Sequence, residues 1–285
     1  MHIELSPARH AAIAESTPRQ LAWRWFKTFR WHLLPLFLSD FGRSLIRRKY
    51  DAVTTDRAYD VKSSGRFLVG KLIDWFVLRQ SLHEGLRQRL RIVASELVRL
   101  TLEYENRGAV PVRIVSGPCG LGRDLSLTAQ TLRAGGPLKG RVELWGIDLD
   151  SSGEALPEAA QRVREQGVEL AVRKSDLLAP SALMDEFQGK RVHIFNSIGL
   201  TPWLTMEEVA RLFATAHRIL APGGALVVDN FHVHAQSKFG PDLEMDTRYH
   251  PDDLFERVLE AAGFEIEQRQ ETPNRVNVVY TARRR

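Results

Sequence analysis

The alternation of apolar and polar positions changes near residue 108. Beyond it, short runs rich in β-branched residues alternate with stretches of helical periodicity. This rhythm predicts βαβ units and a parallel sheet covered on both faces, because doubly buried strands appear as continuous apolar runs. The predicted strands are VPVRIVS, VELWGIDL, VELAVRKSD, VHIFNS and GALVVDNF, and the helices between them fall at 122–134, 154–166, 180–188 and 206–220.

The end of the chain predicts one more helix and a pair of strands. HPDDLFERVLEAAGF, from residue 250, has helical periodicity and ends at a glycine. EIEQRQ and NVVYTARRR then form a final hairpin around the turn residues ETPN.

Residues 1–108 show no alternating strand pattern and predict helices. The segment 71–108 forms a helix that we expect to bend near Gly85, and residues 18–50 form another that is interrupted around Pro35. Between them, DAVTTDRAYDVKSSGR is a polar connector. We therefore predict two regions, a helical region at 1–108 that caps a sheet domain at 109–285.

Composition is that of an ordinary soluble protein, with 285 residues of which 44% are hydrophobic. The single cysteine, Cys119, excludes an intramolecular disulfide and a cysteine-built metal cage, and no metal site is predicted. The first twenty residues lack the apolar core of a signal peptide, and no segment has about 18 uninterrupted apolar residues. We therefore expect a cytoplasmic protein.

Positive charge is concentrated near the start of the chain. The net charge is +5, and residues 19–50 hold eight Lys and Arg against one acid, Asp40. Such a bias suits a phosphate-bearing partner, either nucleic acid or an anionic membrane surface. It equally suits a solvated face.

A glycine-rich turn follows the first predicted strand. RIVSGPCGLGRD, residues 113–124, places Gly117, Gly120 and Gly122 where a strand leads into a helix. In isolation this is a tight turn, but Asp148 ends the next strand, 148 − 122 = 26 residues later. An acid there is placed to accept hydrogen bonds from ribose hydroxyls. The GxxGxG spacing differs from the dinucleotide fingerprint, which favours a nucleoside without a pyrophosphate.

The third strand also ends in an acid. Asp176 is placed to accept a hydrogen bond from an exocyclic amine. A lone acid in a loop is common, but the order of glycine turn, ribose acid and third-strand acid on consecutive corners of one sheet is far less common by chance.

With these motifs, residues 110–285 resemble a class I S-adenosylmethionine-dependent methyltransferase. The corner at Pro222, Gly223 and Gly224 is similar to the family's turn before strand five. The resemblance implies a Rossmann-like, mostly parallel seven-stranded sheet with one antiparallel strand, and S-adenosyl-L-methionine as the cofactor. It implies cofactor contacts from Ser116, Gly117, Gly120, Gly122, Asp148, Asp176 and Asn196.

One position departs from the family pattern. The family has an acid before the glycines and a glycine where Pro118 stands, whereas this chain has Ser116, Gly117 and Pro118. The missing acid helps to orient the cofactor's amino group. Ser116 or a backbone carbonyl is expected to take this role. Residues 59–89 also resemble the leader of a group of uncharacterised bacterial methyltransferases, which gives no substrate.

Candidates for the chemistry follow the fourth and fifth strands. Methyl transfer is an in-line displacement in which positioning supplies much of the rate enhancement, so a base is needed only if the acceptor must lose a proton. His232 and His234 are the predicted bases, since histidine titrates near neutrality. Both also fit a polar loop without a catalytic role. Tyr59, Trp203 and Asn230 are the predicted acceptor contacts.

The fourth strand also limits the substrate. Family members that methylate exocyclic amines of adenine or cytosine carry a Pro-Pro-aromatic stretch there, whereas this chain has NSIGLTPW.

Three interpretations of the function remain open. The first is a methyltransferase acting by O- or N-methylation on a small-molecule or lipid-like acceptor. The second is an RNA methyltransferase that uses the basic leader, for which the chain offers few RNA-binding signatures. The third is a non-catalytic nucleoside-binding module that docks a partner.

The basic, Trp-rich segment 19–31 bears on the partner. It is typical either of a helix that docks on its own domain or of one that lies in a membrane interface. Contact of residues 19–50 with the inner face of the membrane is therefore a second, weaker expectation beside domain docking.

Overall fold

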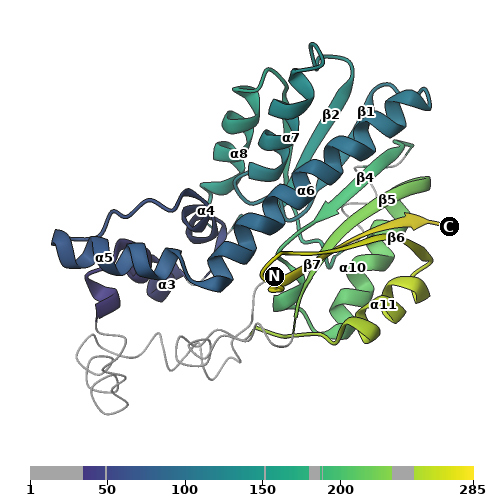
Figure 1. Cartoon of the computed structure of the whole chain (residues 1–285). Coiled ribbons are helices and arrows are strands. Elements are labelled where there is room, and N and C mark those ends of the chain that lie inside the picture. Colours follow the sequence, from purple (N-terminus) through teal and green to yellow (C-terminus); the bar gives the residue numbers. More distant parts are fainter. Residues whose placement is uncertain (1–34, 49, 151, 180–186, 188, 233–246) are drawn as a thin grey trace.

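The described strands form one seven-stranded sheet (Figure 1). The computed structural model describes residues 35–48, 50–150, 152–179, 187, 189–232 and 247–285. The strand order is β3-β2-β1-β4-β5-β7-β6, and β7 runs antiparallel to both of its neighbours while the other pairs are parallel. The strands are β1 (Val112–Ser116), β2 (Val142–Asp148), β3 (Leu170–Lys174), β4 (Val192–Ser197), β5 (Leu220–Phe231), β6 (Phe264–Glu271) and β7 (Asn277–Arg284). The predicted mixed sheet with one antiparallel strand is confirmed.

Helices cover both faces of this sheet, as the continuous apolar strands require. One apolar core lies between the sheet and α6, α7 and α8, and a second between the sheet and α10 and α11. These helices are α6 (Ser81–Asn106), α7 (Arg123–Arg133), α8 (Ala155–Arg164), α10 (Met206–Ile219) and α11 (Asp252–Ala261). The predicted helices at 122–134, 154–166, 206–220 and after 250 are confirmed, while most of 180–188 lies outside the described residues.

The helical region before the sheet differs from its prediction in two places. It contains α3 (Asp40–Arg48), α4 (Ala52–Asp60) and α5 (Phe67–Leu78) before α6. The expected bend at Gly85 is wrong, because the helix breaks at Arg79 and Gln80 instead. Gly85 lies inside α6, where a Cβ atom would stand 2.6 Å from the side chain of Val276. This glycine therefore allows the helix to approach the β6–β7 turn.

The polar connector predicted at 51–66 is wrong over its first half, because residues 52–60 form α4. Asp51 caps the helix by accepting a hydrogen bond from the backbone N–H of Thr54 at 2.7 Å. The face that α4 buries consists of Thr54, Asp56 and Ala58. Since two of these side chains are polar, the helix has no apolar stripe by which its sequence could reveal it.

The predicted division into 1–108 and 109–285 stays a prediction. The end of α6 coincides with that boundary, but Val93, Leu97 and Leu100 of α6 belong to the core beneath the sheet. No helix in the part of the chain that the structure describes has both the length and the apolar character needed to cross a membrane.

Candidate functional site

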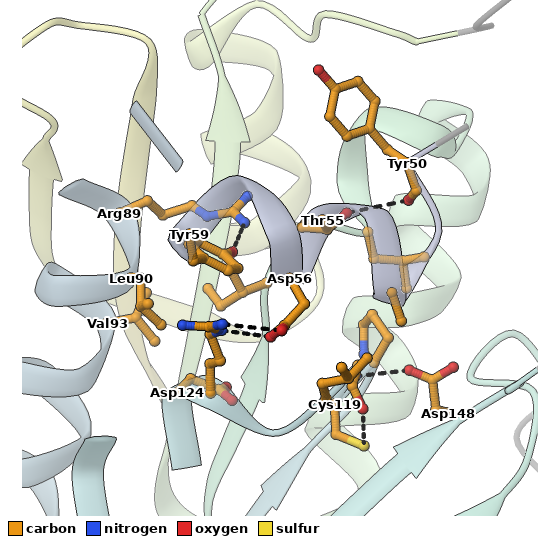
Figure 2. Close-up of a pocket in the computed structure, with 18 of the residues that line it drawn as sticks. Tyr50, Thr55, Asp56, Tyr59, Arg89, Leu90, Val93, Cys119, Asp124 and Asp148 are labelled. Atoms are coloured by element: carbon orange, nitrogen blue, oxygen red, sulfur yellow. Dashed lines mark hydrogen bonds and ion pairs between the residues drawn. The ribbon is translucent and has the colours of Figure 1, made fainter. Parts of the chain in front are cut away.

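A pocket of about 240 Å³ lies where the parallel strands end at their carboxyl side (Figure 2). This is the edge at which open α/β sheets bind ligands. Its floor includes Gly120 of the glycine turn and Asp148 at the end of β2. Helix α4 contributes Asp56 and Tyr59, and α6 contributes Arg89. The helical region and the sheet thus line one pocket.

The glycine turn follows β1 closely because its backbone is tied to β2. The Cys119 N–H donates to the Ile147 carbonyl at 2.9 Å. Gly120 and Gly122 have φ angles of +48° and +68°, a region that side-chain-bearing residues rarely adopt. These two glycines let the chain turn directly into α7 while leaving backbone exposed to the pocket.

The carboxylate of Asp148 fixes the glycine turn by hydrogen bonds. One carboxylate oxygen accepts from the Gly120 N–H at 2.9 Å, and the other accepts from the Asp150 N–H at 2.9 Å. Asp150 in turn caps α8 by accepting from the N–H groups of Ala155 and Leu156, each at 3.1 Å. Asp148 is only half-buried and lines the pocket, so it retains acceptor capacity toward a ligand.

A second carboxylate, which the sequence analysis missed, lies at the end of β1. Asp124, in the first turn of α7, accepts a hydrogen bond from Ser116 Oγ at 3.0 Å and another from the side-chain amide of Asn196. It lines the pocket, whereas Ser116 is fully buried behind it. Burial raises the pKa of the Asp124 carboxyl, although its hydrogen bonds, the Leu125 N–H among them, oppose the rise. The only sign of this contact in the sequence is an acid eight residues after Ser116. The glycine turn brings that acid back to the end of β1.

Ion pairs of Asp56, which lines the pocket, hold helix α4 against the sheet domain. Asp56 is buried and accepts from Arg162 at 2.6 Å and from Arg123 at 3.0 Å. Burial by itself would raise the pKa of Asp56, but the hydrogen bonds and charges of the two guanidinium groups outweigh it and leave that pKa lowered. The carboxylate therefore stays ionised where α4 meets α7 and α8.

Arg89, which lines the pocket, forms a buried ion pair with Asp229 of β5. Arg89 of α6 donates to Asp229 at 2.7 Å and to the hydroxyl of Tyr59 at 3.0 Å. Asp229 also accepts from the Gly199 N–H at 2.7 Å. Figure 2 shows the guanidinium of Arg89 joined to the Tyr59 hydroxyl. Together these hydrogen bonds connect α4, α6 and the ends of β4 and β5.

Of the residues predicted to form the site, four line this pocket, namely Tyr59, Gly120, Asp148 and Trp203. Four others lie behind the pocket and shape the turn, namely Ser116, Gly117, Gly122 and Asn196. The side-chain amide of Asn196 donates to Ser116 Oγ at 3.0 Å, and its backbone carbonyl accepts from the Gly117 N–H at 2.8 Å. Asp176, after β3, accepts from the Leu178 N–H at 2.9 Å and is not among the residues that line the pocket.

The predicted catalytic side has a different arrangement. His232 Nδ1 lies 3.1 Å from the carboxylate of Asp252, and the Asn230 amide donates to the same carboxylate at 3.0 Å and to the His250 carbonyl at 2.9 Å. Neither His232 nor Asn230 is among the described residues that line the pocket. His234 lies outside the described residues.

The strand order, the glycine turn and the acid at the end of β2 define a Rossmann-like type of α/β domain. The fold is that of class I S-adenosylmethionine-dependent methyltransferases, as solved structures with this architecture demonstrate.

Three solved structures illustrate the similarity. A possible exported protein from Bordetella parapertussis superimposes with a TM-score of 0.68 at 19% identity, over 89% of this chain and 86% of its own. Magnesium protoporphyrin IX methyltransferase from Synechocystis PCC 6803, bound to SAH, gives a TM-score of 0.55 at 15% identity, over 85% of this chain and 100% of its own. N-methyltransferase NodS from Bradyrhizobium japonicum WM9, bound to S-adenosyl-L-homocysteine, gives 0.50 at 15%, over 82% and 97%. No protein-family model and no curated protein matches the sequence.

Proposed function

We propose that the protein is an S-adenosylmethionine-dependent methyltransferase that acts on a small-molecule or lipid-like acceptor by O- or N-methylation. The observation that carries the proposal is the pair of carboxylates, Asp148 and Asp124, on either side of one glycine turn in one pocket. Two polar groups of the cofactor, the ribose diol and the α-ammonium group, are the groups that such carboxylates would bind.

The residues present fit this cofactor. Asp148 is already oriented by two backbone N–H groups and would accept from both ribose hydroxyls. Asp124 supplies a negative charge beside Ser116, at the position where this chain lacks the acid of the family pattern, and would bind the ammonium group. Asp176 keeps its proposed role toward the adenine amine.

Bound there, the cofactor supplies an electrophilic methyl group. The protein's part is to hold an acceptor in line and to exclude water. We propose that α4 caps the site and that Tyr59 and Trp203, which line the pocket with Arg89, contact the acceptor. The Tyr59 hydroxyl is fixed by Arg89 at 3.0 Å, so it would present a stable polar group to the acceptor. Roles for Asn230, His232 and His234 stay predictions.

Label transfer tests this function. The protein is incubated with S-adenosylmethionine that carries a ¹⁴C-methyl group and with an extract of its source cells, which is then separated into lipid, small-molecule and RNA fractions. The proposal predicts label in the lipid or small-molecule fraction, and much less of it with Asp148→Ala when the cofactor is not saturating. Label in RNA would instead identify an RNA methyltransferase. Cofactor binding without label in any fraction would indicate a non-catalytic nucleoside-binding module.

A further inference from the structure

Helix α5 has its apolar face outward. The residues that it buries, Gly70, Asp74 and Leu78, are spaced four apart and form one narrow stripe. Its large apolar side chains are exposed, to 80% for Phe67 and 62% for Phe76. A helix that packs on a domain normally shows the reverse arrangement. We call the exposed set the α5 surface; it consists of Phe67, Leu68, Val69, Leu72, Trp75 and Phe76.

The buried stripe fixes this orientation. The carboxylate of Asp74 accepts hydrogen bonds from the Ser39 hydroxyl and from the N–H groups of Phe41 at 3.2 Å and Ser64 at 3.0 Å. A Cβ atom at Gly70 would stand 2.2 Å from the Leu38 carbonyl oxygen, so only glycine permits this close approach. Rotating α5 to bury its apolar side chains would break these bonds and this contact. The exposed apolar face is therefore built into the fold.

Exposed charges around the α5 surface have a single sign. Lys62, Arg66, Lys71 and Arg79 are all exposed, while Asp74, the acid in residues 61–80, is buried. The Arg79 guanidinium lies 4.6 Å from the centre of the Trp75 ring, which places a cation directly beside an exposed aromatic. Figure 1 shows α5 at the end of the molecule away from the sheet, where no described element covers its outer side.

We propose that the α5 surface docks the protein on an anionic lipid surface. An exposed apolar helix face with aromatic residues and a basic rim is the composition of an interfacial helix, whose apolar side chains enter the headgroup and acyl boundary. Lipid phosphates would meet the basic rim, and each such charge strengthens attraction to a negative leaflet. The surface is distinct from the basic segment 19–31, and the docking does not depend on the proposed methyl transfer.

Charge also argues against two other occupants. In a symmetric dimer through α5, the four basic side chains of each copy would face or flank those of the other, which is unfavourable. Residues 1–34 hold five Lys and Arg against two Glu, so this segment repeats the positive sign of the rim. An anionic membrane is complementary to the rim.

Vesicle sedimentation of the full chain tests the proposal. Vesicles contain either phosphatidylcholine alone or phosphatidylcholine with phosphatidylglycerol. The intact protein is expected to sediment with the anionic vesicles and to be released by salt. Leu72→Ser/Phe76→Ser should lower the apparent affinity at least tenfold. The matched control, Leu102→Ser/Val110→Ser, removes two exposed apolar side chains outside α5 and should bind as the intact protein does.

Several results would overturn the proposal. Equal binding by Leu72→Ser/Phe76→Ser would assign lipid contact to another part of the chain, and the absence of sedimentation would exclude lipid docking. Light scattering that shows a dimer without vesicles, lost in the same variant, would assign the surface to a second copy. If that variant fails to fold, Arg66→Glu/Lys71→Glu decides: weaker binding supports the proposal, and unchanged binding refutes it.

Discussion

At the scale of single residues, Asp124 illustrates how an unexpected side chain takes a position that the sequence left without an acid. Ser116 at the end of β1 is buried and donates to Asp124, so the carboxylate stands in front of the serine on the pocket side. Desolvation raises the pKa of this carboxyl above its ordinary value of 3.8. An approaching ammonium group would offset that desolvation, which suits a cation-binding role.

Replacing this carboxylate should affect binding far more than stability. Asp124→Asn keeps the shape of the side chain but removes the charge and replaces one acceptor oxygen by an amide group. We therefore expect at least tenfold weaker binding of S-adenosyl-L-homocysteine, with a much smaller effect on the melting temperature. Losing a charge-assisted hydrogen bond costs about 1.5–3 kcal/mol. Calorimetry and thermal melts measure the two effects.

The pH dependence separates the charge from the shape. Because the pKa of Asp124 is raised, the intact protein should lose affinity on acidification at a higher pH than an ordinary aspartate would cause. Asp124→Asn should lack that component. Identical pH profiles for the two proteins would exclude Asp124 as the ammonium-binding group.

At the scale of elements, the sequence predicts the sheet well and the helical region less well. The central strands are apolar on both faces, so each is marked in the sequence by a continuous apolar run. The sequence does not predict helix α4, because polar contacts hold the helix in place. Thr54 Oγ1 lies 2.8 Å from Ser44 Oγ, and Asp56 binds two arginines. Contacts between residues far apart in the chain leave no local pattern.

The residues of the site likewise divide into those that the sequence predicts and those that it does not. Gly120 and Asp148 were predictable because backbone conformation and strand-end position each restrict the residue type. The roles of Asp124 and Arg89 were not, because each depends on where a helix lies relative to a strand end. The outward face of α5 was missed for a related reason: an apolar run predicts a buried helix until its surroundings are known.

The start of α6 contains a histidine that makes the helical region sensitive to acid. His83 Nδ1 donates to the Val77 carbonyl at 2.7 Å, and Nε2 lies 3.0 Å from the Tyr50 hydroxyl. The His83 and Phe41 rings pack edge to face, with their centres 5.0 Å apart. Burial, with a smaller effect of the Arg87 guanidinium, lowers the pKa of His83 to about 4, although the bond to Val77 opposes this.

We expect His83 to reduce stability as the pH falls. In the unfolded chain its pKa is near 6.5, so between pH 6.5 and about 4 the unfolded state binds the proton better and is favoured. From pH 7.5 to 5 this amounts to about 2 kcal/mol. His83→Asn, which can keep the bond to Val77, should be less stable at pH 7.5 but lose less on acidification. Denaturant unfolding at both pH values checks this, and equal losses for both proteins would contradict it.

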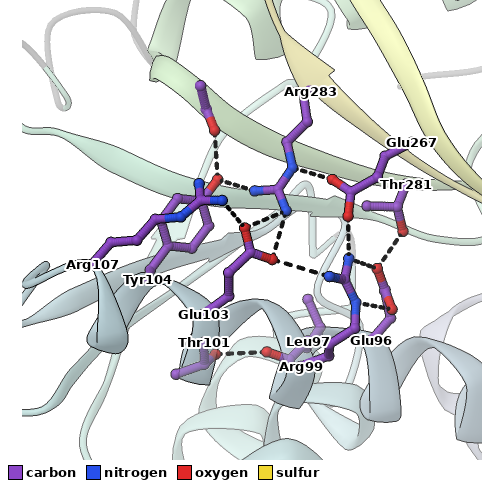
Figure 3. A network of polar contacts seen from close by, with 11 residues as sticks. Glu96, Leu97, Arg99, Thr101, Glu103, Tyr104, Arg107, Glu267, Thr281 and Arg283 are labelled. Carbon is purple, nitrogen blue, oxygen red and sulfur yellow. Dashed lines mark hydrogen bonds and ion pairs between the residues drawn. The ribbon is translucent and has the colours of Figure 1, made fainter.

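At the scale of the whole molecule, α6 connects the helical region to the sheet. Its carboxyl-terminal half is clamped on the antiparallel strands by the network in Figure 3, where Arg283 binds Glu103 at 2.8 Å and Arg99 binds Glu267 at 2.9 Å. Its amino-terminal half places Arg89 in the lining of the pocket, where it is paired with the buried Asp229. One helix therefore sets the distance between the two sides of the site.

The buried pair of Arg89 and Asp229 should contribute more to the free energy of unfolding than the more exposed ion pairs at the end of α6. Removing one member leaves an uncompensated buried charge, so Arg89→Met is expected to lower the free energy of unfolding by about 3–5 kcal/mol. The double variant Arg89→Met/Asp229→Asn should recover part of that loss. Arg107→Met, which breaks the pair between the exposed Arg107 at the end of α6 and Glu103, should cost about 0–1 kcal/mol. Equal effects of the two single variants in denaturant unfolding would refute this assignment.

Calorimetric titration with S-adenosyl-L-homocysteine tests most directly whether this pocket binds the proposed cofactor. The intact protein should bind one molecule per chain, and Asp148→Ala should weaken binding by an order of magnitude or more, because it removes the acceptor for the ribose hydroxyls. Asp253→Ala, which removes an exposed carboxylate on α11, should bind as the intact protein does. Absence of binding by the intact protein, or equal affinity in Asp148→Ala, would contradict the account.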